Sequence, residues 1–181
     1  MKVARSIVAA MAGLLLLPGL SLAVPTSRNS DEALRLMTDI RHEADLAARN
    51  LDSADTGAWS LMTSWKDHAQ RLDTIKTAIN RMGSDYSRLQ NMESTVAPWE
   101  KKAIDQTFPL LQEMAVHTRD AIDYLNHDQI NLWRPQFQKF ESSLDGESHD
   151  LAREMSEYVR YGNVHSAEKQ LERKLDRQAA S

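Results

Sequence analysis

His68 and His117, with Glu113 beside the second histidine, are the residues in this sequence whose types suit a bound ligand. The histidines lie at similar distances before and after a predicted turn, so antiparallel helices would bring them within about 5 Å of one height. Two imidazoles and a carboxylate can bind zinc, copper or iron, and His with Met114 can ligate haem iron. The alternative is that both rings pack at the edge of the core, beside Trp65 and Met114.

Two tryptophans, Trp59 and Trp99, are the candidates for a contact with a partner protein. Each begins a predicted helix and lies off its best apolar seam, so we expect exposed rings. An exposed tryptophan at the end of a helical bundle can anchor a partner. The alternative is that each ring packs only on its own turn.

Motifs for catalysis are missing from the sequence. It has no His-Glu-x-x-His, no glycine-rich phosphate loop and no nucleophile elbow, and it lacks the Glu-x-x-His pairs of di-iron bundles. The absence of cysteine excludes disulfides, thiolate zinc sites, iron–sulfur clusters and cysteine nucleophiles. We therefore expect a protein that is not an enzyme, and our preferred interpretation includes no cofactor.

Apolar residues recur at alternating steps of three and four, a spacing typical of amphipathic helices that pack against one another. The first predicted helix has the seam Ala33, Met37, Ile40, Ala44, Ala47 and Leu51. The second is predicted over residues 56–93. The third begins at Pro98 and has the seam Ile104, Phe108, Leu111, Ala115, Thr118, Ile122 and Leu125. The fourth is predicted to begin near residue 128, or at Pro135, and to end at Gly162 and Asn163.

Six glycines and five prolines in 181 residues are too few for the turns of an all-β fold. Short connections between helices favour antiparallel neighbours. We therefore predict an all-α fold: an antiparallel up-down-up-down four-helix bundle with uneven helix lengths and a short C-terminal helix. The predicted organisation is a signal peptide (1–23), a flexible lead (24–29), the helical bundle (30–162) and a C-terminal amphipathic helix or tail (163–181).

The first helix is predicted to be much shorter than the second, which leaves part of one bundle position empty. We expect the C-terminal tail to fold back and fill it. Gly83, Pro109 and Gly146 are predicted to lie at one level of the bundle. They are either tolerated in place or form a hinge between two half-bundles.

The N-terminus has the features of a secretory signal peptide: Lys2 and Arg5, an apolar stretch over residues 6–20, and the cleavage pattern Ser21-Leu22-Ala23. The formal charge of −4 argues against a general nucleic-acid binder. We expect a periplasmic or secreted bacterial protein with no membrane span after cleavage. It would act by binding a protein partner in the envelope, as an adaptor or chaperone-like protein, or by self-association. The alternative is a small periplasmic metal- or haem-binding bundle that uses His68 and His117.

Overall fold

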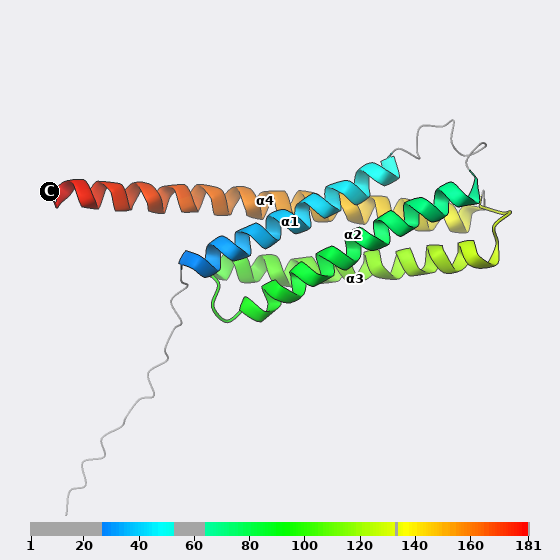
Figure 1. Ribbon diagram of the computed structural model, residues 1–181, viewed down its shortest axis with the longest axis horizontal. Coiled ribbons are helices and arrows are strands. Elements are labelled where there is room, and N and C mark those ends of the chain that lie inside the picture. The colour runs from blue at the N-terminus through cyan, green and yellow to red at the C-terminus, as the bar shows by residue number, and fades with distance from the viewer. Residues whose placement is uncertain (1–26, 53–63, 133, 181) are drawn as a thin grey trace, which may run out of the picture.

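The computed structural model describes residues 27–52, 64–132 and 134–180. These residues form four helices: α1 (Ser27–Asp52), α2 (Trp65–Met92), α3 (Pro98–His127) and α4 (Pro135–Ala179). Each helix packs against its two neighbours around a ring, and the diagonal between α1 and α3 is nearly free of contacts. Figure 1 shows the helices alternating in direction, so the predicted up-down-up-down four-helix bundle is confirmed.

The core lies along the bundle axis and is lined by one face of every helix. All six residues of the first predicted seam are at most 4% exposed, from Ala33 to Leu51. They belong to one core cluster with large apolar side chains of α4, including Phe137, Leu144 and Leu151, which are fully buried. Burial of these side chains is the main stabilising contribution to the fold. Among the described residues, no helix has the length and apolarity required to cross a bilayer.

The predicted second helix extends over residues 56–93, and α2 is described from Trp65 onward. Ser64 fixes this start, because its backbone N–H and its hydroxyl both donate to the Asp67 carboxylate, at 2.9 and 2.8 Å. Those bonds hold the pKa of Asp67 below its usual value. Such a carboxylate in the first turn satisfies a donor that the helix cannot. Trp59 lies outside the described residues.

Part of the predicted seam of α3 is wrong: of its seven residues, Phe108 and Ala115 are exposed and Ile122 is only partly buried. Phe108, Ala115 and Ile122 were expected in the core, but Phe108 is 50% exposed. The residues one position earlier are buried instead: Thr107, Met114 and Ala121. The other four residues of the predicted seam are buried as expected: Ile104, Leu111, Thr118 and Leu125. Thr107 is tolerated there because its hydroxyl donates to the Ala103 carbonyl at 2.7 Å within the helix. Phe108 instead stacks on Tyr86 of α2, with ring centroids 5.6 Å apart.

The prediction of a separate C-terminal helix that folds back is also wrong. α4 is continuous for 45 residues and passes through Gly162 and Asn163 without a break. Gly162 does not end the helix but lets it approach its neighbours: a Cβ there would lie 2.7 Å from both Leu34 and Trp99. Beyond this contact α4 continues past the start of α1, so the segment does not fill the space beside α1 (Figure 1). The alternative start at Pro135 is the observed one, as a first-turn proline favours.

Gly83, Pro109 and Gly146 all lie inside continuous helices. A Cβ added at Gly83 or Gly146 would meet no atom within 4 Å, so core packing does not require a glycine at either position. The hinge at this level remains a prediction.

Candidate functional site

His68 lies on α2 and points towards α4. Its Nδ1 is 2.8 Å from Oε1 of Glu141, and a guanidinium nitrogen of Arg71 is 3.4 Å from the same oxygen. The imidazole also packs edge-on against Phe137, with ring centroids 5.2 Å apart. His68 is therefore part of a largely buried cluster that joins α2 to α4.

His117 makes the corresponding contact from α3. Its Nδ1 is 2.6 Å from Oε1 of Glu147 on α4. Burial raises the pKa of the Glu147 carboxyl, the positive charge of His117 opposes this rise, and the negative charge of Glu113 adds to it. Glu113 is exposed on α3 and so acts on this pair through its charge.

The structure does not bring the three predicted metal ligands together. His68 and His117 face glutamates six residues apart on α4, which corresponds to about 9 Å along the helix. Within the described ranges, the ligating atoms of His68, His117 and Glu113 do not form a cluster that could hold one ion. A metal or haem site on these histidines remains a prediction without a geometry that supports it.

Trp99, the predicted partner anchor on α3, is half-buried at the end of the bundle. Its indole lies edge-on to Tyr161 of α4, with ring centroids 5.3 Å apart. The two rings line a surface groove of about 790 Å³ between α3 and α4, with the following side chains around it: Lys102, Gln106, Glu154, Glu157, Tyr158, Arg160 and Val164. The groove is aromatic at its base and has charges of both signs at its edge.

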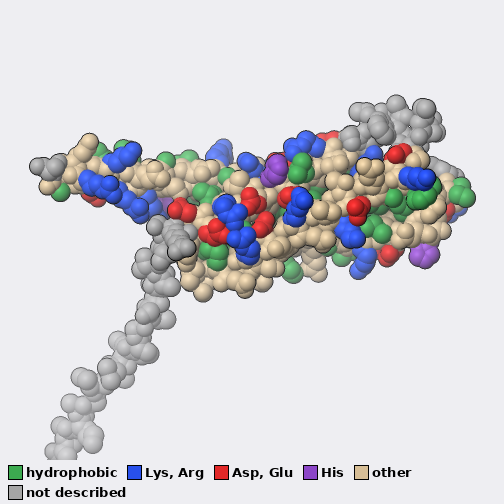
Figure 2. Space-filling model, viewed as in Figure 1, with side chains coloured by type: hydrophobic (Ala, Val, Ile, Leu, Met, Phe, Trp, Pro, Cys, Tyr) green, Lys and Arg blue, Asp and Glu red, His purple; other side chains and the backbone are tan. Residues whose placement is uncertain are grey.

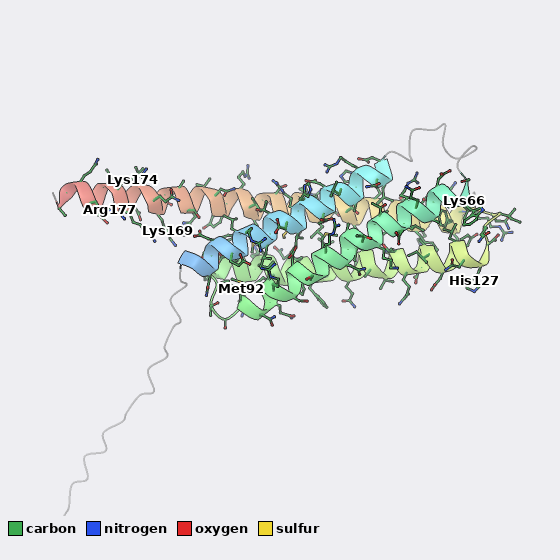
Figure 3. The ribbon with its side chains drawn as sticks, viewed as in Figure 1. Lys66, Met92, His127, Lys169, Lys174 and Arg177 are labelled. Atoms are coloured by element: carbon green, nitrogen blue, oxygen red, sulfur yellow. The ribbon has the colours of Figure 1, made fainter. Side chains whose placement is uncertain are left out.

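The last part of α4, residues 163–179, follows the close contact at Gly162, and we call it the arm; its end projects from the bundle (Figure 2). Figure 3 shows Lys169 near the level of the start of α1, and Lys174 and Arg177 further along the arm, beyond the other helices. Its apolar side chains are also exposed, because no described segment covers them. The large ones are Val164, Leu171 and Leu175. They lie on the same side of the helix as Tyr161, at steps of three, seven and four residues. Glu168 occupies the intermediate position between Val164 and Leu171.

A buried carboxylate lies beneath the base of the arm. Glu100 of α3 is fully buried, and its Oε2 accepts hydrogen bonds from the Ala97 backbone N–H at 2.5 Å and the Ser30 hydroxyl at 3.4 Å. Its Oε1 has no hydrogen-bond partner among the described residues. Burial raises the pKa of Glu100, although these bonds and the positive charges of Lys169 and His165 act in the opposite direction.

A second cluster of ionisable side chains was missed by the sequence analysis. His149 of α4 lies 3.2 Å from Asp52 at the end of α1 and 3.6 Å from Asp145, one turn earlier on α4. The available signal was the spacing from Asp145 to His149, which sets both side chains on one face of a helix. Asp52 comes from a different helix, and its approach depends on how α1 packs against α4.

No protein-family model matches this chain, and neither a curated protein nor a solved structure matches it. Function therefore has to be argued from the residues of the chain itself. Two features of the described surface suit that purpose: the arm with the groove at its base, and the cluster between α1 and α4.

Proposed function

We propose that this chain is a non-enzymatic interaction protein whose arm binds an amphipathic α-helix of a partner protein. The observation that carries the proposal is the exposed apolar line on the arm, formed by Val164, Leu171 and Leu175. Covering a leucine that is now exposed contributes about 1.5–3 kcal/mol, so these residues together contribute several kcal/mol towards the cost of association.

The spacing of this line defines the partner's shape. Apolar residues at alternating steps of three and four form a seam that receives the side chains of another helix. The arm is about 17 residues long, near the length at which an isolated helix is only marginally stable in water. A helix packed along the seam would stabilise the arm and bury its apolar side chains together.

Glu168 defines the partner's charge. It occupies the one charged position in the apolar line, between Val164 and Leu171. A partner helix with Lys or Arg at the facing position would pair with it. A second copy of the arm fits poorly. Parallel pairing would set two Glu168 side chains against each other, and antiparallel pairing would set Glu168 against Val164 or Leu171.

The groove extends the same surface onto the bundle. Trp99 and Tyr161 line it where the arm begins, so a partner helix on the arm would continue over both rings. Aromatic side chains of this kind contribute strongly at protein interfaces. The proposed place of action is the bacterial envelope or the exterior, because residues 1–23 have the pattern of a secretory signal peptide.

The test is photo-crosslinking of the full chain in the cells that produce it. A photoreactive residue at Leu171 is compared with one at Arg173, which lies on the opposite side of the arm two residues away. We expect an adduct with a different protein from position 171 only. Replacing Glu168 with Lys, with the crosslinker still at 171, should weaken that adduct, because the facing charge of the partner becomes repulsive.

Three results would contradict the proposal. The first is equal labelling from positions 171 and 173, which would indicate non-specific contact. The second is an adduct of twice the mass of the chain, which would assign the arm to self-association. The third is an adduct that is insensitive to Glu168→Lys, which would exclude the helix with a facing basic residue.

A further inference from the structure

Three side chains with metal-ligating atoms converge where the end of α1 meets α4. Asp145 and His149 lie one turn apart on α4, and Asp52 is the last residue of α1. Nε2 of His149 is 3.2 Å from Oδ1 of Asp52 and 3.6 Å from Oδ1 of Asp145. One ligand atom from each residue lies within 4.8 Å of the other two.

These distances suit a small tetrahedral ion. Zn²⁺ binds imidazole nitrogen and carboxylate oxygen at about 2.0–2.2 Å, which sets neighbouring ligand atoms of a tetrahedral site roughly 3.3–3.6 Å apart. Of the two distances from His149 Nε2, 3.6 Å is at the upper limit of that interval and 3.2 Å is just below it, and the two carboxylate oxygens lie within 4.8 Å of each other. The spacing of Asp145 and His149 is also that of the two ligands on one helix in His-Glu-x-x-His zinc sites.

Charge favours a cation at the same place. The cluster has two carboxylates and one imidazole, so its own side chains carry a net negative charge whether His149 is protonated or neutral. Asp52 is at the C-terminal end of α1, where the helix dipole adds further negative potential. A divalent cation is attracted both by the carboxylates and by this end of α1.

The chemistry of the ligands selects among cations. Mg²⁺ and Ca²⁺ prefer oxygen ligands alone, whereas imidazole with carboxylate is a common ligand set for Zn²⁺. We propose that Asp52, Asp145 and His149 form a Zn²⁺ site, with water as the fourth ligand. His149 and Asp52 are about half exposed, so water and the ion reach the site without rearrangement of the helices. The bound ion joins the end of α1 to the first third of α4.

The experiment is calorimetric titration of the metal-free chain at pH 7.5 with Zn²⁺ alone, repeated with Mg²⁺ and Ca²⁺. We expect one equivalent of Zn²⁺ to bind and the other two ions to bind far more weakly. The melting temperature should rise with Zn²⁺ concentration, because only the folded chain holds ligands from both helices together. Co²⁺ in place of Zn²⁺ should give the visible absorption of a tetrahedral complex.

The matched variants are His149→Asn and His165→Asn. Both histidines are on α4, but His165 is outside the three-residue cluster and its ion-pair partner is Glu168, at 3.8 Å. We expect His149→Asn to weaken Zn²⁺ binding more than about tenfold and His165→Asn to leave it unchanged. Asp145→Asn, which preserves side-chain size, should also weaken binding while the far-ultraviolet circular dichroism stays constant.

The proposal is overturned by a chain that binds no Zn²⁺, which would make the cluster a set of hydrogen-bonded ion pairs only. It is also overturned by Zn²⁺ binding that His149→Asn leaves intact. If His68→Asn or His117→Asn abolishes binding instead, the ion belongs to those histidines and not to this cluster.

Discussion

The two parts of α4 have the same backbone conformation and opposite environments. From Pro135 to Gly162 the helix lies against α1 and α3, and Leu151 in this part is 0% exposed. In the arm only the first residues, such as Val164, lie near another helix, and Leu171 further along is 58% exposed. A continuous helix therefore need not be a uniformly packed one. The presence of α1 and α3, rather than the sequence of α4 alone, decides which leucines stabilise the bundle.

The largest expected effect comes from replacing one leucine by alanine in each of the two parts of α4. Leu151→Ala removes fully buried methyl groups and leaves a cavity, so we expect a loss of about 3 kcal/mol in the free energy of unfolding. Leu171→Ala should change it by less than about 0.5 kcal/mol, because its side chain is already in water. Urea unfolding followed by circular dichroism measures both. Comparable losses in the two variants would mean that the arm is covered in the protein under study.

The second effect is at the point where the two parts of α4 meet. Gly162→Ala puts a Cβ 2.7 Å from Leu34 and Trp99, and the resulting displacement should cost about 1–2 kcal/mol. Gly83→Ala and Gly146→Ala are matched controls with open space at the Cβ. They should stabilise by about 0.5–1 kcal/mol, because alanine favours the helix. Stabilisation by all three substitutions would show that α4 does not approach its neighbours closely at Gly162.

The third effect is a pH dependence of stability at Glu100 of α3, which lies near the base of the arm. The pKa of Glu100 is raised in the folded chain, chiefly by burial, so the folded state binds more protons than the unfolded state just above pH 4.5. The contribution of Glu100 to stability therefore falls as the pH rises through that window. Glu100→Gln keeps an acceptor for the Ala97 N–H and removes the ionisation. Relative to the unmodified chain, this variant should gain stability between pH 5 and pH 7.5 in urea titrations. Parallel stability curves would exclude a raised pKa.

The smallest effect is expected from removing the arm altogether. Deleting residues 163–181 removes no residue whose described side chain is buried in the core, so the melting temperature should change by less than about 2 °C. Differential scanning calorimetry measures it directly. A drop of 10 °C or more would show that the arm packs on the bundle, as the original expectation of a tail that folds back required.

The sequence predicted the buried face of a helix correctly where the apolar periodicity allowed only one such face. The first seam, from Ala33 to Leu51, lies within the buried face of α1: all six of its residues are buried, together with Leu36 and Ala48 beside it. α3 has apolar residues on two adjoining faces, so periodicity alone could not choose between Phe108 and Thr107. The choice depends on the angle at which α2 and α4 approach, and that angle is a property of the packed bundle.

Gly162 and His149 show the same limit for local signals. A glycine followed by an asparagine is a common helix end, but here the glycine is required by the proximity of Leu34 and Trp99, which come from two other helices. The contact between His149 and Asp52 could not be predicted from local spacing, because the two residues are 97 positions apart in the chain. Interactions of this kind appear only when the helices are placed together.

The continuity of α4 through Gly162 also has a mechanical consequence. The arm projects about 25 Å beyond the last close contact, so it works as a lever whose fulcrum is the Gly162 contact with Leu34 and Trp99. A tilt of only about 5° at that point moves the tip by roughly 2 Å. Because the helix is continuous, a small tilt at Gly162 displaces the tip of the arm by more than it displaces the atoms of the contact itself.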